Sequence, residues 1–139
     1  MIPSAQPLKR RIQAGAQTWG AWLNLASPLS AELIASLGFD WVCIDMEHGP
    51  GDMLALQSQL QAIRITPGVT PVVRIAANDP ALIKWVLDVG AEGIVVPSVD
   101  SAQEGEAAVQ AVRYPPKGRR GVARASRALP QSPRSCRSK

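Results

Sequence analysis

Short apolar segments alternate with amphipathic segments along most of the chain. The apolar segments favour β-strands because they are short and nearly continuous, and they span residues 16–23, 41–47, 70–76 and 93–98. The segments that follow them carry apolar residues at helical spacing, and they span residues 27–38, 52–63, 79–90 and 101–113. The sequence therefore predicts a strand followed by a helix, repeated four times. A fifth strand is expected to begin within residues 119–126.

Capping residues mark two of the predicted helices. Asp79 precedes Pro80, a pair typical of a helix N-terminus, and Gly90 is placed to close the same helix. Ser101 and Glu104 have the spacing of a capping box at the start of the last helix. These signals locate the starts of the third and fourth helices.

The apolar spacing also predicts which side of each helix faces the core. For the helix at residues 27–38 we expect the core-facing residues to be Leu29, Leu33, Ile34 and Leu37. The corresponding residues of the next two helices are Met53, Leu56, Leu60, Ile63, Ile83, Val86 and Leu87. Gly38 is placed to end the helix at residues 27–38.

Four strand–helix repeats with nearly continuous apolar strands predict an α/β fold with a parallel sheet covered on both faces. Such a sheet is either doubly wound or part of a (β/α)8 barrel, and periodicity does not separate the two. The segment after the first strand, GAWLNLASP, lacks the glycine-rich turn of a dinucleotide-binding wound sheet. In both folds, functional residues gather at the carboxyl ends of the strands.

Length and composition predict one globular domain. The chain has 139 residues, of which 46% are hydrophobic and 19% charged, which suits a packed core. We expect no membrane span, because no apolar run approaches 18 residues, and no secretory signal, because the basic start lacks an apolar segment. Cys43 lies inside an apolar strand and Cys136 is far from it, which indicates a reducing, cytoplasmic location.

The formal net charge of +4 conceals an uneven distribution. Residues 1–106 hold all 11 acidic side chains and 6 basic ones, whereas residues 107–139 hold 9 basic side chains and no acidic one. Residues 113–139 are rich in Arg, Ser and Pro and have no apolar period. We expect a disordered, solvated tail there; binding to nucleic acid is the less favoured interpretation, because it has charge alone in its support.

Ionisable side chains gather where two predicted strands end. Asp45, Glu47 and His48 follow one apolar strand, and Arg74 lies at the tip of the next. Asp45 and Glu47 share one side of an extended strand, so a hard divalent cation would relieve their repulsion. An imidazole exchanges protons near neutral pH, and a guanidinium binds carboxylate or enolate oxygens. The set suggests proton transfer beside a carbonyl, with stabilisation of an enolate.

Structural interpretations compete with this one. His48 fits a turn residue bonded to the backbone, and Arg74 fits an ion pair that merely neutralises Asp45 or Glu47. Asp88 has the pattern of an ordinary surface carboxylate. The four tryptophans are typical of a core rather than of a ligand site; they are Trp19, Trp22, Trp41 and Trp85.

Four segments of the chain match a known family in their order and spacing. They are WGAWLNLASPLSAELIASLGFD, GFDWVCIDMEHGPGD, PVVRIAANDP and IKWVLDVGAEGIVVPSVDSAQEGEAAVQAVRYPPKGRRGV. From about residue 8 to residue 127 the chain closely resembles the HpcH/HpaI aldolases, which include 4-hydroxy-2-oxoheptanedioate aldolase. The resemblance implies part of a TIM (β/α)8 barrel. It also implies a class II, divalent-metal-dependent retro-aldol cleavage of a small keto acid to pyruvate and an aldehyde.

The resemblance also implies roles for individual residues. His48 would be the general base, oriented by Asp88. Arg74 would bind the pyruvate carbonyl and stabilise its enolate, and Trp19 would line the substrate pocket. Members of this family form homo-oligomers in the cytoplasm and act in the catabolism of aromatic compounds.

This chain departs from the family at the metal site, which in the family holds Mg²⁺, Mn²⁺ or Co²⁺. In the family a Glu and an Asp from later strands hold the metal directly, and Asp45 and Glu47 would lie near it through water molecules. No acidic residue follows Glu106 in this chain, so the direct ligands are absent.

The end of the chain departs from the family as well. Residues 1–120 match a barrel of about four βα units, and the matching pattern becomes short and then ends within residues 121–139. We interpret this as a barrel cut at its midpoint, as a frameshift or an early stop would produce. Open sheet edges would then destabilise the monomer. We expect weak or absent aldolase activity, and the alternative function is a non-catalytic fragment that pairs with a complementary half.

Overall fold

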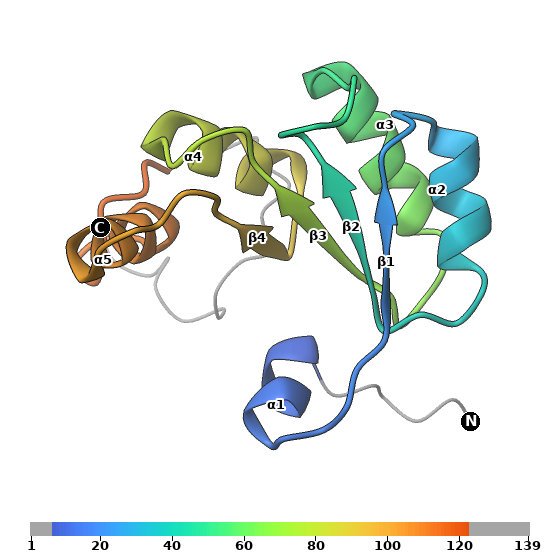
Figure 1. Cartoon of the computed structure of the whole chain (residues 1–139), viewed down its shortest axis with the longest axis horizontal. Helices are drawn as coiled ribbons and strands as arrows, with labels where there is room; N and C mark the ends of the chain where they lie inside the picture. Colours follow the sequence, from blue (N-terminus) through green and yellow to red (C-terminus); the bar gives the residue numbers. More distant parts are fainter. Residues whose placement is uncertain (1–6, 123–139) are drawn as a thin grey trace, which may run out of the picture.

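The computed structural model describes residues 7–122, which form one parallel sheet with helices along it (Figure 1). The four strands are β1 (Gly20–Leu23), β2 (Trp41–Asp45), β3 (Thr70–Arg74) and β4 (Gly93–Val95). The five helices are α1 (Leu8–Gln13), α2 (Pro28–Ala35), α3 (Met53–Ile63), α4 (Pro80–Val89) and α5 (Ala102–Val112). Each predicted strand–helix pair is present. None of the helices within residues 7–122 combines the length and the hydropathy that crossing a membrane requires.

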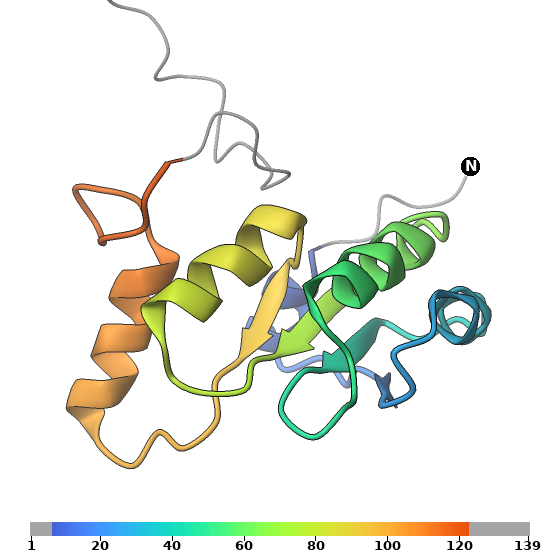
Figure 2. The same cartoon turned by 90° about the horizontal axis from the view of Figure 1, so that it is seen from above.

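The order of the strands identifies the type of α/β fold. All three strand pairs are parallel, and the order in the sheet is β1-β2-β3-β4. This order follows the chain without the reversal that defines a doubly wound sheet. Right-handed crossovers then place successive helices on the same side, and Figure 2 shows α2 to α5 in an arc along that side. The predicted α/β fold of four successive barrel units is confirmed.

The helices therefore cover one face of the sheet. The core-forming strand side chains alternate with those of the opposite face, and they include Leu23, Val42, Ile44, Val73 and Ile75. The sequence left open whether helices cover both faces, as in a doubly wound sheet, or one face, as in a barrel; within residues 7–122 they cover one. The cause is the unreversed strand order, which places every crossover on the same side. The opposite face, which would line the interior of a barrel, carries the polar residues discussed below.

Helix α2 packs differently from the prediction. Leu29, Leu33 and Leu37 are 75%, 64% and 65% exposed, whereas Ala31 and Ala35 are fully buried. Small side chains let the helix approach the sheet and α3 closely. Of the four predicted residues only Ile34 packs against the core. The spacing failed for the three leucines, because α2 lies beside the edge strand β1 and its outer side has no neighbour within residues 7–122.

The predictions for α3 and α4 are confirmed. Leu56, Leu60 and Ile63 of α3 are buried, as are the predicted residues Ile83, Val86 and Leu87 of α4, and Met53 packs partly buried against the same core. These helices lie over central strands, so their apolar sides meet the sheet directly.

The predicted caps of α4 and α5 are also in place. The Asp79 carboxylate accepts from the backbone N–H of Ala81 at 2.7 Å, and Gly90 ends α4 with a φ of 115°. Ser101 and Glu104 form the reciprocal capping box of α5. The predicted caps therefore hold for α4 and α5, whereas α2 ends at Ala35, before the predicted Gly38.

All four strands are shorter than predicted, and the fifth is not seen in the described part. Strands β2 and β3 each end two residues early, at Asp45 and Arg74. Strand β1 begins at Gly20 rather than at residue 16, and β4 ends at Val95 because Pro97 and a positive φ at Ser98 follow. Residues 119–122 form no strand.

The expectation of a disordered tail is wrong for residues 113–122, because the Arg119 N–H donates to the Gln110 carbonyl and the Arg120 N–H donates to the Arg113 carbonyl. The rest of the predicted tail, residues 123–139, lies outside the described part of the chain.

Gly20 offers a test of the packing between β1 and β2. A Cβ atom at Gly20 would lie 2.1 Å from the Trp41 ring, whereas one at Gly105 in α5 would meet nothing closer than 3.7 Å. We expect Gly20→Ala to lower the free energy of unfolding by about 1–3 kcal/mol. The matched variant Gly105→Ala should raise it by about 0.5–1 kcal/mol, because Ala favours a helix. Urea unfolding followed by circular dichroism measures both, and equal effects would contradict the packing described here.

Candidate functional site

Asp45 and Arg74 form the centre of a polar cluster at the carboxyl ends of the strands. They are register partners on the neighbouring strands β2 and β3. Arg74 donates from Nε to Asp45 Oδ1 at 3.0 Å and from Nη2 to Asp45 Oδ2 at 2.6 Å. The Asp45 side chain is fully buried, and that of Arg74 is partly exposed. This two-point geometry fixes the plane of the guanidinium.

Asp45 also organises the chain that follows it. Its Oδ1 accepts from the backbone N–H groups of Glu47 at 3.0 Å and His48 at 3.2 Å, and its Oδ2 accepts from Asn24 Nδ2 at 2.9 Å. The hydrogen bonds from Arg74 hold the pKa of Asp45 well below its usual range, against the opposing effect of burial. The carboxylate therefore stays charged at neutral pH and ends the strand in a fixed turn.

Glu47 and His48 lie on the turn beyond β2. The strand does not stay extended as far as Glu47, yet both carboxylates still reach one cation: Glu47 Oε2 lies 3.2 Å from Arg74 Nη1. His48 Nε2 lies 3.8 Å from Glu47 Oε1, and the His48 side chain is 69% exposed. Arg74 thus occupies the position between the two carboxylates that the sequence suggested for a metal ion.

Trp22 packs against the guanidinium from β1. The Arg74 Cζ atom lies 4.7 Å from the centre of the Trp22 ring, within the range of a cation–π contact. Trp22 and Asn24 belong to the site, but the sequence did not indicate them. Trp22 and Asn24 flank the buried Leu23 in the sequence. This alternation could have indicated both residues, because it places them on the face opposite to the helices.

The structure does not bring Trp19 to this cluster. Trp19 precedes β1, and its backbone N–H donates to Asp40 Oδ2 at 2.7 Å. Asp40 itself precedes β2 and pairs with Arg11 of helix α1, and α1 lies at the amino ends of the strands (Figure 1). Trp19 therefore lies at the amino ends of the strands, whereas Arg74 lies at their carboxyl ends.

The structure does not bring Asp88 to His48 either. Asp88 lies in the last turn of α4, near the amino end of β3, as the Glu92 N–H bond to the Pro71 carbonyl at 2.9 Å indicates. Its Oδ1 accepts from Arg120 Nη2 at 2.7 Å. The carboxylate is thus paired with another residue of this chain.

Within residues 7–122, no group of three or more His, Cys, Asp or Glu side chains converges as a metal site would require. Asp45 and Glu47 are both in contact with Arg74. The donor set of the described residues therefore does not fit a directly bound divalent ion.

The Asp45–Arg74 pair gives a test of stability against pH. We expect Asp45→Asn to lower the free energy of unfolding at pH 7 by about 2–3 kcal/mol, because a buried acceptor of five hydrogen bonds loses its charge. The folded pKa of Asp45 lies below the unfolded value of about 4. Its contribution is therefore present above pH 4 and is lost as the pH falls further, so the difference between the two proteins should shrink in acid.

Urea unfolding at a series of pH values measures this effect. Asp100→Asn is the matched control, because the backbone N–H of Asp100, and not its carboxylate, makes its hydrogen bond at 2.8 Å. A loss of stability that is equal for both variants, or one that does not vary with pH, would contradict the role given to Asp45.

Comparison with known proteins supports a family assignment. The family model for HpcH/HpaI aldolase/citrate lyase matches residues 18–131. The chain is 52% identical over 123 residues to a hydroxypyruvate/pyruvate aldolase from Pseudomonas aeruginosa, covering 86% of this chain and 46% of the relative. It is 51% identical over 123 residues to a 4-hydroxy-2-oxo-heptane-1,7-dioate aldolase from Klebsiella pneumoniae, with the same coverage. The chain thus spans about half the length of these relatives.

A solved structure agrees with the sequence match. An HpcH/HpaI aldolase/citrate lyase family protein from Burkholderia cenocepacia J2315 superposes with a TM-score of 0.82 at 41% identity. The superposition covers 87% of this chain and 49% of that structure. The family model, the sequence identities and the shared fold lead to one conclusion: this chain belongs to the HpcH/HpaI aldolase/citrate lyase family.

Proposed function

We propose that this chain carries the keto-acid-binding part of an aldolase that cleaves a 4-hydroxy-2-oxo acid to pyruvate and an aldehyde. The observation that carries the proposal is the Arg74 guanidinium, which Asp45 holds in one plane at the carboxyl ends of the strands, beside His48. Two relatives, named a hydroxypyruvate/pyruvate aldolase and a pyruvate aldolase, support pyruvate as the common product.

Arg74 is arranged to bind a ligand as well as Asp45. A guanidinium has five N–H groups, and the hydrogen bonds to Asp45 use only two of them. Glu47 contacts Nη1, and the side chain remains partly exposed. The remaining N–H groups suit the carboxylate and the C2 oxygen of a 2-oxo acid, because a planar fork matches two coplanar oxygens.

His48 is the proposed base of the reaction. Its exposed imidazole would take the proton of the C4 hydroxyl. The C3–C4 bond then breaks, an aldehyde leaves, and the electron pair moves through C3 to the C2 oxygen to give the enolate of pyruvate. Arg74 would stabilise the negative oxygen. The proton taken up by His48 then returns, directly or through water, to C3 and completes pyruvate, so protons and electrons balance.

Trp22 is the side chain that we propose as a wall of the pocket, in place of Trp19. Its ring covers one face of the Arg74 guanidinium, and it restricts from which side a ligand approaches. The Asp88 carboxylate accepts a hydrogen bond from Arg120. The geometry of residues 7–122 therefore gives no support to Asp88 as the residue that orients His48.

A divalent ion such as Mg²⁺, Mn²⁺ or Co²⁺ supplies Lewis-acid polarisation of the carbonyl in aldolases of this class. The described residues do not fit it as direct ligands. Asp45 and Glu47 are proposed only as acceptors for water bound to such an ion. Binding of a keto acid without turnover is therefore the second candidate function, and the missing donor set among residues 7–122 favours it.

Binding of oxalate tests the role of Arg74. Oxalate is planar and anionic and resembles the enolate of pyruvate. We expect saturable binding by calorimetry without added metal, and we expect Arg74→Lys to weaken it about tenfold or more, because the fork is lost while the charge stays. Arg113→Lys, at the exposed end of α5, is the matched control and should leave the affinity unchanged. Oxalate binding that is insensitive to Arg74→Lys would refute the proposed site.

Release of pyruvate tests the role of His48. With a 4-hydroxy-2-oxo acid as substrate and added Mg²⁺, Mn²⁺ or Co²⁺, we expect His48→Gln to lower the rate of pyruvate formation about 100-fold or more. Oxalate affinity should stay within about twofold of that of the unchanged chain, because the exposed imidazole is not a ligand of the anion. Oxalate binding that persists without any pyruvate release from the unchanged chain would favour the second candidate, binding without turnover.

A further inference from the structure

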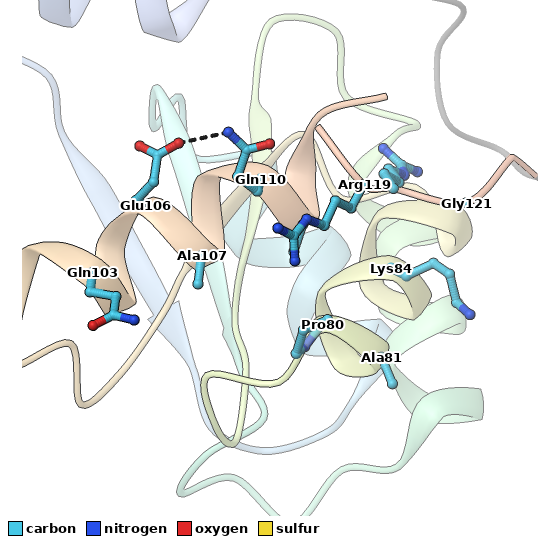
Figure 3. Close-up of a pocket in the computed structure, with 11 residues that line it drawn as sticks. Pro80, Ala81, Lys84, Gln103, Glu106, Ala107, Gln110, Arg119 and Gly121 are labelled. Carbon is cyan, nitrogen blue, oxygen red and sulfur yellow. Dashed lines mark hydrogen bonds between the residues drawn. The ribbon is translucent and has the colours of Figure 1, made fainter. Parts of the chain in front are cut away.

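A cavity of about 580 Å³ lies between helices α4 and α5, apart from the strand-end cluster (Figure 3). Its walls come from three parts of the chain: α4, α5 and the segment 119–121 that follows them. The volume is within the range of small-molecule sites. None of the residues to which the proposed function gives a role lines it.

The lining of this α4–α5 cavity is basic. Lys84 comes from α4, and Arg119 and Arg120 come from the segment after α5. Glu106 is the acidic residue among the lining side chains, and its Oε1 accepts from Gln110 Nε2 at 2.7 Å. Asp88 neutralises Arg120, so the three lining cations exceed the two nearby carboxylates, Glu106 and Asp88, by one positive charge, which favours an anion.

Arg120 supplies a buried donor at the wall of the cavity. Only 6% of its surface is exposed. Its Nη2 donates to Asp88 at 2.7 Å, and its guanidinium lies over the Tyr114 ring at 4.8 Å. Its Nε is buried, and no atom of residues 7–122 accepts from it. Asp88 and Tyr114 fix the Arg120 guanidinium at the wall of the cavity.

We propose that the α4–α5 cavity binds the phosphate group of a small phosphorylated metabolite. Arg120 is held at the wall by Asp88 and Tyr114, and Lys84 of α4 and Arg119 of the segment after α5 add positive charge to the lining. The apolar part of the lining, which includes Pro80 and Ala111, and the amide of Gln110 suit the remainder of the molecule. The cavity is larger than a bare phosphate, which is the reason to assign a phosphorylated metabolite rather than an inorganic ion.

Calorimetric titration of the full chain tests this site. Inorganic phosphate, glycerol 2-phosphate and acetate are the probes, at constant ionic strength. We expect saturable binding of both phosphates, with glycerol 2-phosphate the tighter, and no saturable binding of acetate. Lys84→Gln and Arg119→Gln should each weaken phosphate about tenfold, since each removes one charge-assisted contact. Lys117→Gln removes an equal charge from an exposed residue outside the lining and should leave binding within about twofold.

A second variant isolates the buried donor. Arg120→Lys keeps the positive charge and removes the planar guanidinium, and it should weaken phosphate about tenfold, with circular dichroism confirming that the fold is kept. The proposal is overturned if phosphate does not saturate, or if acetate binds as well as phosphate. It is also overturned if Lys117→Gln weakens binding as much as Arg119→Gln, because the effect would then be general attraction by a basic surface.

Discussion

The hydrogen-bonded pair of Asp45 and Arg74 is the interaction on which the functional end of this sheet depends. It joins β2 to β3 at the ends of both strands. The same carboxylate bonds the turn that carries His48 and takes a further bond from Asn24 after β1. One buried carboxylate thus connects three strands, and removing its charge would release the arginine, the turn and the first strand together. The chemistry of the site and the stability of the strand ends are therefore inseparable.

The cluster around Asp45 and Arg74 lies on a surface that the described residues do not fully enclose. Helices cover one face of the sheet, and the other face leaves Trp22 and Val95 substantially exposed among residues 7–122. Electrostatic stabilisation of an enolate is strongest where water is excluded. The fixed geometry of Arg74 is already present in this chain, whereas the low-dielectric surroundings are not supplied by the residues described. Binding of a keto acid, which needs the geometry, and its turnover, which also needs exclusion of water, are therefore separable properties.

Arg74 and Arg120 are held in different ways. Arg74 is satisfied by carboxylates on one side and presents its other N–H groups to solvent. Arg120 is almost completely buried, pairs with Asp88, and keeps one donor without an acceptor in the described part of the chain. The first arrangement suits a ligand that arrives and leaves as a reactant. The second suits an anion that completes the packing between two helices.

The sequence by itself determined the alternation of strands and helices, the helix caps at Asp79, Gly90 and Ser101, and the position of polar groups after two strands. These features depend on neighbours within a few residues, so local rules are sufficient. Only the tertiary structure decided that α2 buries alanines instead of leucines, that Trp22 rather than Trp19 meets Arg74, and that Asp88 pairs with Arg120. Each of these depends on which elements lie side by side, and residues far apart in the chain settle that through strand order and helix packing.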